Sequence, residues 1–238
     1  MADRMTEDLD GVLALKASAK SARDDEDWSE AIEDLQEAID LLQRRLPEPP
    51  APVPSWLAAE LADTYGIVGG VEKRWGLSLT GADRHRHLQA SVAAYDQGFR
   101  YEHDLEANDA STYNRINRLV GRVLLEPGIL QGEGADLDLD GELEKAETIL
   151  TEQLRSMRQK DPWAYCDLGT IRLLRDKPDA LATIHELDRL RPPEFVYDSA
   201  LATIEPLSEV ASSYRPRLAE AVSLLRRSAR YLTRTDHL

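Results

Sequence analysis

Apolar residues recur at helical spacing along nearly the whole chain, and this feature restricts the possible fold more than any other. The segment WSEAIEDLQEAIDLLQRRL, residues 28–46, places five large apolar side chains three or four residues apart: Trp28, Ile32, Leu35, Ile39 and Leu42. That spacing puts them on one face of an α-helix. Strand signals are weak, because β-branched residues rarely cluster and no Asn-Gly or Asp-Gly turn joins two alternating runs. The sequence therefore predicts an all-α fold.

Clusters of proline and glycine divide the helical pattern into segments. Proline interrupts a helix interior, and the clusters stand at residues 47–54, 76–83, 126–141, 160–162 and 191–194. Between them the helical segments fall into pairs, which is typical of a solenoid. We expect a single domain over residues 1–238 with about four to five helical hairpins, at 1–46, 55–104, 108–158 and 162–190, with a terminal pair at 195–232.

The second helix of each pair shares a spacing of small and large residues. In the first two pairs the series are Trp28, Ala31, Leu35, Ala38 and Leu88, Ser91, Tyr95, Gly98. Small residues let two helix backbones approach closely, and large ones fill the groove between pairs. This is the tetratricopeptide (TPR) spacing, lengthened here by loops. We therefore expect a TPR-like α-solenoid, in which each pair stacks on its neighbours and the curved array leaves a concave surface.

Three stretches carry a more specific pattern, at residues 62–77, 93–121 and 161–184. The residues that keep the pattern are Thr64, Gly69, Lys73, Tyr95, Gly98, Phe99, Tyr113, Ile116, Asn117, Asp161 and Trp163. Together they resemble the TPR-type TRAF-binding domain family, found in the central regulatory region of apoptosis signal-regulating kinases and in bacterial proteins. The resemblance implies a helical platform that links a sensor or partner to an effector, in bacterial signalling or conflict systems. It does not imply an enzyme.

The chain is acidic, with a formal net charge of -15, and the charge is unevenly placed. Phosphate binding needs a basic surface, so the composition argues against nucleic acid and against an anionic membrane face. Residues 1–50 carry fourteen acidic and six basic side chains, whereas residues 215–238 carry six arginines against two acids. This uneven charge suggests an alternative function, in which the protein is an adaptor that self-assembles head to tail into a homo-oligomer. Solvated arginines on a last helix are the simpler interpretation.

Catalytic and targeting motifs are missing from the sequence. It has no phosphate-binding glycine loop and no paired-histidine zinc motif, so we expect no catalytic residues and no enzyme. His85 and His87 are predicted to lie in a solvated basic turn, and the glycines of residues 66–70 to permit close helix contact. Cys166 is the only cysteine and is predicted to be a buried thiol. With no apolar leader or membrane-length apolar run, we expect a cytoplasmic protein.

The segment DLDLDGELEKAE, residues 136–147, has the spacing of an EF-hand calcium loop. Its candidate ligands are Asp136, Asp138, Asp140, the backbone carbonyl of Glu142, and Glu147. The preceding residues would make a poor entering helix, and the sequence has no second loop of this kind. Asp140 as the N-cap of the next helix, with Glu142 in its first turn, explains the same acidity through the helix dipole. Two interpretations of this segment therefore remain: the loop of a calcium-responsive regulator, or a capped helix that needs no cofactor.

We expect a non-catalytic protein-binding scaffold or regulatory subunit that docks a protein or peptide in a TPR groove. Side chains of the first helices of the hairpins would line that groove. By repeat register, the predicted partner-binding residues are Trp56, Asp63, Asn114, Arg118, Arg122, Trp163 and Thr170. Packing inside the array is an equal alternative for each of them, and Asn117 is predicted to form hydrogen bonds there.

Overall fold

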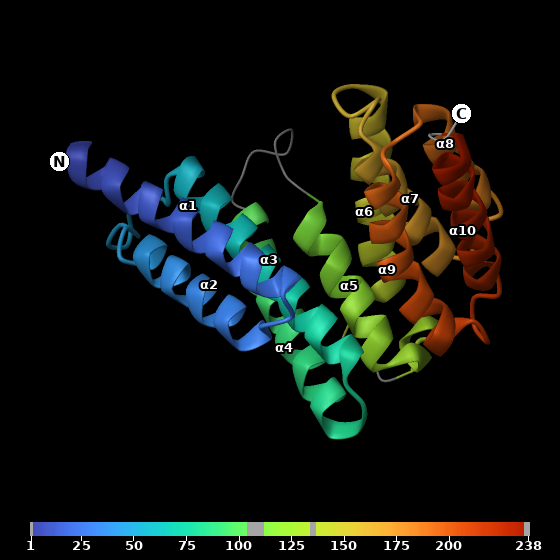
Figure 1. Cartoon of the computed structure of the whole chain (residues 1–238), viewed down its shortest axis with the longest axis horizontal. Coiled ribbons are helices and arrows are strands. Elements are labelled where there is room, and N and C mark those ends of the chain that lie inside the picture. The colour runs from blue at the N-terminus through green and yellow to red at the C-terminus, as the bar shows by residue number, and fades with distance from the viewer. Residues whose placement is uncertain (1, 104–111, 134–136, 236–238) are drawn as a thin grey trace. The chain divides into compact units, whose positions relative to one another are not determined.

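A computed structural model describes residues 2–103, 112–133 and 137–235, and these residues form helices joined by short loops (Figure 1). Over these residues the chain has ten α-helices, one short 3-10 helix and no strand, which confirms the predicted all-α fold. The elements are α1 (Ala2–Asp24), α2 (Trp28–Gln43), α3 (Ser55–Ser78), α4 (Gly81–His103), α5 (Tyr113–Leu125), η1 (Pro127–Gln131), α6 (Leu139–Arg155), α7 (Pro162–Leu174), α8 (Ala180–Leu190), α9 (Glu194–Ala211) and α10 (Arg217–Thr235).

The chain divides into two compact units, Met1–Gly121 and Arg122–Leu238. In the first unit α1 packs on α2, α2 on α3 and α3 on α4. In the second unit α6 packs on α7, α7 on α8 and α9 on α10. Helices that pack on their neighbours in chain order are characteristic of a solenoid-like fold. A single array over residues 1–238, with the five hairpin boundaries given above, stays a prediction.

Helix α2 illustrates how the sequence determines a local element. The carboxylate of Asp27 accepts a hydrogen bond from the backbone N–H of Glu30 at 3.2 Å, and so caps a donor that the first turn leaves unpaired. The buried face of the helix consists of Ala31, Leu35, Ala38, Ile39 and Leu42. Burying such a face contributes about 25 cal/mol per Å² of apolar surface. Amphipathic spacing therefore places α2 against both α1 and α3.

Close approach between α3 and α4 depends on a glycine. A Cβ atom on Gly69 would lie 2.8 Å from the ring of Tyr95, which is fully buried. The hydroxyl of Ser91 donates a hydrogen bond to the carbonyl oxygen of Gly69 at 2.7 Å. Gly66 leaves similar room for Tyr113 of α5, 3.0 Å from where its Cβ would be. The predicted role of these two glycines in helix contact is confirmed.

The second unit has a core of its own, contributed by all five of its α-helices. Its fully or nearly fully buried apolar side chains include Leu143, Leu150, Leu168, Ile171, Leu187, Ile204, Leu207, Leu218 and Leu225. Two of its helices start at prolines: Pro162 occupies the first turn of α7, and Pro193 is the N-cap residue of α9. Proline is favourable there because the first helical N–H groups have no partner within the helix. The side chains of Trp163 and Phe195 therefore occupy equivalent places near the starts of their helices.

Two local predictions are wrong. Helix α6 is capped by Asp138, whose carboxylate accepts from the backbone N–H of Gly141 at 3.0 Å, so Asp140 lies within the first turn instead of at the cap. His87 is buried in α4, with its Nδ1 2.6 Å from a carboxylate oxygen of Glu72 and its ring against Trp75. Because α4 already begins at Gly81, helical rotation turns His87 toward α3.

Candidate functional site

Asn114 lies inside the first unit, where α3, α4 and α5 meet. Only 1% of this residue is exposed. Its side-chain amide donates to the carbonyl oxygen of Ala62 and to Glu102 Oε1, both at 2.9 Å. A Cβ on Gly98 would lie 2.6 Å from the Asn114 side chain, so glycine is what lets α4 come this close. Asn114 was predicted to bind a partner; in the structure its side chain is buried and joins three helices.

Lys73 and Asn117 form a second polar contact in the same interior. Lys73 Nζ donates to Asn117 Oδ1 at 3.0 Å, and the Asn117 amide donates to the backbone carbonyl of Tyr113 at 3.0 Å. The Tyr113 ring meets the Tyr95 ring edge-on, with centroids 5.9 Å apart. The predicted internal hydrogen bonding of Asn117 is confirmed. Motif residues that are distant in the sequence thus share one packed cluster, whose role is to fix α3, α4 and α5 together.

Trp56 and Asp63 are both exposed on α3, and Asp63 also forms an ion pair. Trp56, near the start of the helix, is 40% exposed. Asp63 forms an ion pair with Lys16 of α1, and Glu60 pairs with the same ammonium group at 3.1 Å. Burial of Lys16 disfavours its charge, but hydrogen bonds and charge attraction from Asp63 and Glu60 outweigh burial and raise its pKa. Asp63 therefore connects α1 to α3 while its side chain stays 61% exposed, and Trp56 presents a ring to solvent.

Arg118 is held within the first unit. Its guanidinium lies 3.3 Å from Asp96 and 4.0 Å from the centroid of the Phe99 ring, while Arg115 covers the same ring at 4.7 Å. Cation–π contacts of this kind stabilise by about 0.5–1 kcal/mol at partly exposed sites. Arg122, one turn further along α5, is exposed. Of the two predicted arginines, Arg122 is the accessible one.

Trp163 and Phe195 form an exposed aromatic pair in the second unit. Their ring centroids are 6.1 Å apart, and the two residues are 39% and 59% exposed. Thr170, predicted on the same face as Trp163, is buried, and its hydroxyl donates to the carbonyl oxygen of Cys166 at 2.9 Å. Sequence reasoning missed Phe195. The available signal was its position, because Phe195 is the second residue of a helix that starts next to a proline, as Trp163 is.

Cys166 lies on α7 one turn beyond Trp163 and is mostly buried. Burial raises the pKa of its thiol to about 12, and the negative charges of Asp167 and Asp161 add to the increase. A thiol with this pKa stays protonated at neutral pH, and a protonated thiol is a poor nucleophile. The environment therefore agrees with the predicted unreactive cysteine, and it also reports negative charge along this part of α7.

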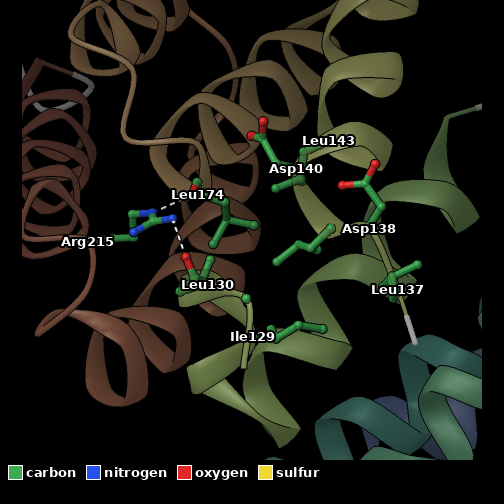
Figure 2. Close-up of a pocket in the computed structure, with 10 residues that line it drawn as sticks. Ile129, Leu130, Leu137, Asp138, Asp140, Leu143, Leu174 and Arg215 are labelled. Carbon is green, nitrogen blue, oxygen red and sulfur yellow. Dashed lines mark hydrogen bonds between the residues drawn. The ribbon is translucent and has the colours of Figure 1, made fainter. Parts of the chain in front are cut away.

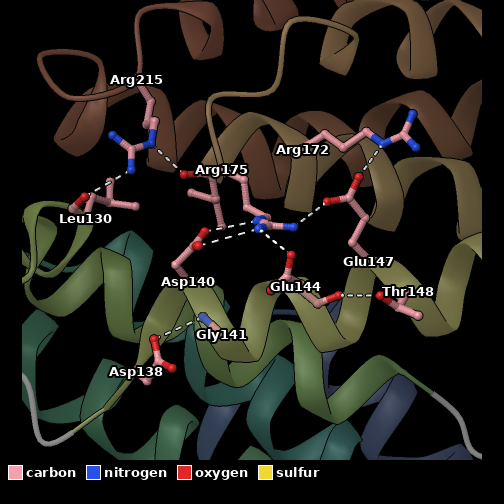
Figure 3. A network of polar contacts seen from close by, with 11 residues as sticks. Leu130, Asp138, Asp140, Gly141, Glu144, Glu147, Thr148, Arg172, Arg175 and Arg215 are labelled. Carbon is pink, nitrogen blue, oxygen red and sulfur yellow. Dashed lines mark hydrogen bonds and ion pairs between the residues drawn. The ribbon is translucent and has the colours of Figure 1, made fainter.

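Three acidic residues of the calcium-like segment, Asp140, Glu144 and Glu147, lie on α6. They face Arg172 of α7 and Arg175, the C-cap residue of that helix (Figure 3). Arg175 binds Asp140 at 3.0 Å, Glu144 at 3.2 Å and Glu147 at 2.8 Å. Hydrogen bonds to Asp140, Glu147 and Glu144 outweigh partial burial and raise the pKa of Arg175 further above its ordinary value. Arg172 binds Glu147 as well, at 2.9 Å. No local pattern in the sequence indicates these ion pairs, because the arginines lie 25 to 35 residues away from their partners.

The other predicted calcium ligands that the structure describes, Asp138 and Glu142, form contacts of their own. Asp138 caps α6, Glu142 pairs with Lys145 at 2.9 Å, and Asp136 lies outside the described residues. Among residues 2–103, 112–133 and 137–235, no group of three or more histidine, cysteine or acidic side chains is placed to hold a metal ion. Calcium binding stays a prediction, and calcium would have to compete with Arg175 for Asp140 and Glu147.

We expect calcium at about 1 mM, which would occupy an EF-hand of sensor affinity, to leave the melting temperature of the protein unchanged relative to magnesium. Arginine already neutralises two of the carboxylates that calcium would need. Differential scanning fluorimetry and isothermal calorimetry measure the effect. A melting temperature that rises with calcium, and no longer rises after exchange of Asp136 and Glu147 for alanine, would instead establish the site.

A small cavity of about 220 Å³ lies beside the first turn of α6 (Figure 2). Its lining is mainly apolar, with Asp138, Asp140 and Arg215 at the edge. The Arg215 guanidinium donates to the carbonyl oxygens of Leu130 at 3.0 Å and Leu174 at 2.5 Å. These bonds fasten η1 and the end of α7 to the loop before α10. Arg215 thus links these segments by hydrogen bonds at the edge of the cavity.

Within the part of the chain that the structure describes, no helix is both long enough and apolar enough to cross a membrane. Neighbouring helices in close contact, with glycines or small residues where they meet, define a protein of the tetratricopeptide class. The chain belongs to the TPR-S family, Tetratricopeptide Repeats-Sensor, whose model matches residues 3–125. That range contains α2 to α5, all of α1 except Ala2, and the whole Asn114 cluster.

The family match confirms the TPR part of the predicted resemblance. The narrower likeness to the TRAF-binding domain family stays a prediction. No match to the chain was found among curated proteins or among solved structures.

Proposed function

We propose that this chain is a non-catalytic protein-binding scaffold or regulatory subunit, which holds a partner protein or peptide through its odd-numbered helices. One observation carries the proposal. The large hydrophobic side chains that are exposed in the described helices lie on successive odd-numbered helices: Leu13 on α1, Trp56 on α3, Tyr113 on α5, Trp163 on α7 and Phe195 on α9. In TPR-type folds the first helix of each hairpin faces the concave binding surface. Exposed aromatic side chains are the usual anchors of protein interfaces.

The residue set that supports this function differs from the set expected by repeat register. Trp56, Arg122 and Trp163 are retained because their side chains reach solvent, and Phe195 is added. Asn114 and Thr170 are removed because both are buried and hydrogen-bonded within the chain. Asp63 and Arg118 are engaged by Lys16 and Asp96 respectively, so their exchange would disturb the fold as well as a partner.

We further propose that the partner belongs to a bacterial signalling or conflict system and that the protein acts in the cytoplasm. The word "Sensor" in the description of the family supports a regulatory role. The TRAF-binding resemblance points in the same direction, since it implies a platform between a sensor and an effector. The single cysteine, which permits no intrachain disulfide, suits a reducing compartment.

The test is affinity capture from source-cell lysate with the full chain immobilised. Trp56→Ala and Arg122→Glu should each reduce capture of the bound partner by about tenfold, as loss of an anchor does. Glu33→Ala on α2 and Gln89→Ala on α4, both exposed on even-numbered helices, are the matched controls and should leave capture intact. Equal capture by all four variants would refute binding through the odd-numbered helices.

Head-to-tail self-assembly is the second candidate, supported by the exposed arginines of the last helix. Arg226, Arg227 and Arg230 are exposed on α10, and Arg226 also pairs with Glu205 at 2.8 Å. An acidic first helical pair on another copy would complement this surface. The arginines account equally well for a solvated last helix, so the partner-binding function is preferred.

A further inference from the structure

The aromatic pair of the second unit lies among carboxylates. Trp163 and Phe195 each occupy the second position of their helix, and the rings meet at a centroid distance of 6.1 Å. Glu194 precedes Phe195, and Asp198 follows it by three residues, on the same side of α9. Both carboxylates are exposed. These residues together form an exposed aromatic surface with carboxylates next to it.

The surrounding charge favours a cation over an anion. Helix starts carry partial positive charge, but each start here has an acid: Asp161 accepts from the backbone N–H of Trp163 at 2.9 Å, and Glu194 lies in the first turn of α9. Within five residues of either ring the sequence has four acids, Asp161, Asp167, Glu194 and Asp198, against three bases, Arg158, Lys160 and Arg191. Arg158 is paired with Asp161 at 2.7 Å.

A basic side chain matches both features of this surface. The faces of tryptophan and phenylalanine rings attract ammonium and guanidinium groups, and carboxylates at the rim add charge attraction. The aliphatic stem of arginine or lysine would at the same time cover apolar ring surface. A purely apolar segment would leave the carboxylates beside it without compensation, and an acidic segment would be repelled.

We propose that Trp163 and Phe195, with Glu194 and Asp198, form a receptor for a basic segment of another protein, in which an arginine or lysine stacks on the ring pair. This inference rests on the proposed protein-binding function and specifies the partner chemistry for one of its surfaces. The chain itself contains a basic helix, α10, so a second copy is an alternative occupant that the experiment has to separate from a different protein.

The probe is a fluorescein-labelled decapeptide of alternating leucine and arginine, titrated with the full chain and followed by fluorescence anisotropy at about 0.15 M salt. A peptide with glutamate in place of arginine is the second probe. We expect the basic peptide to bind and the acidic one not to bind. Phe195→Ala and Trp163→Ala should each weaken binding by about fivefold, the effect of one cation–π contact at a partly exposed site.

Matched variants separate this receptor from general attraction to an acidic chain of net charge -15. Met157→Ala removes a hydrophobic side chain as exposed as Phe195, 59% in both cases, from the turn after α6 in the same unit. The double variant Glu194→Gln/Asp198→Asn is compared with Glu209→Gln/Glu220→Gln, which removes two exposed carboxylates elsewhere in the same unit. Only the first double variant should weaken binding by about fivefold, and both controls should stay within about twofold.

Several results would overturn the inference. One is peptide binding that persists within about twofold in both ring variants, a loss smaller than a cation–π contact gives. Another is an equal loss in the two double variants. A third is a doubled mass by light scattering that Phe195→Ala returns to monomer, since a second copy would then cover the pair. If Trp56→Ala reduces capture from lysate while Phe195→Ala leaves peptide binding unchanged, the protein-binding function stands and only this receptor fails.

Discussion

Gly69→Ala should lower the free energy of unfolding by about 2 kcal/mol, although alanine is the better helix former by about 1 kcal/mol. The new Cβ would lie 2.8 Å from three atoms of the Tyr95 ring, well inside van der Waals contact. Tyr95 has no exposed surface and cannot move aside without disturbing α4 and α5. Overpacking of a buried ring therefore outweighs the gain in helix propensity.

The adjacent residue provides the control for that experiment. A Cβ on Gly70 would have its nearest neighbours, the hydroxyl oxygens of Tyr113 and Tyr95, at 3.5 and 3.6 Å, which is ordinary contact. Gly70→Ala should therefore be neutral or stabilise by up to about 1 kcal/mol. Urea unfolding followed by circular dichroism measures both variants. Equal stabilities would mean that α3 and α4 do not approach as closely as the structure places them.

Arg175→Met should destabilise the second unit by about 2 kcal/mol, because one guanidinium holds three carboxylates of α6. The Arg175 side chain is only 8% exposed, and Glu147 is also largely covered. Methionine preserves most of the aliphatic volume but leaves Asp140, Glu144 and Glu147 to repel one another. The exposed positions of Asp140 and Glu144 limit the loss through solvent screening, so we place it below that of a fully buried pair.

Arg189 is the appropriate comparison, since it pairs with Glu186 on the surface of α8. Arg189→Met should change the free energy of unfolding by less than about 0.5 kcal/mol, the usual contribution of an exposed ion pair. Thermal and urea unfolding of both variants gives the difference. Similar small effects at both positions would show that Arg175 does not fasten α7 to α6.

The helices of this protein were predictable because their determinants are local. Leu35, Ile39 and Leu42 fall on one face of α2 through spacing alone, and Asp27 caps the helix three residues before its bonding partner. Proline and glycine clusters separate the helices for the same reason, since their backbone limits act within one residue. The start of α6 was placed two residues too late because Asp138 and Asp140 are equally good caps in the sequence.

The candidate site was predictable only in part. Repeat register correctly predicted that Trp56 and Trp163 are exposed. It also selected Asn114 and Thr170, which neighbouring helices cover. Helical period states which side of a helix a residue occupies, while burial depends on what packs against that side. Phe195 lies in the predicted terminal pair, residues 195–232, for which no groove-facing residue was predicted.

By itself the sequence determined that the chain forms amphipathic helices, that these make TPR-type close contacts, and that small residues lie where helices meet. Periodicity and backbone restriction act over a few residues, so they can be read without knowing the fold. Only the tertiary structure decided which polar groups are internal, as with Asn114 and His87. It also decided that Arg175 neutralises the acids of α6, because ion pairing depends on distances between residues about thirty positions apart in sequence.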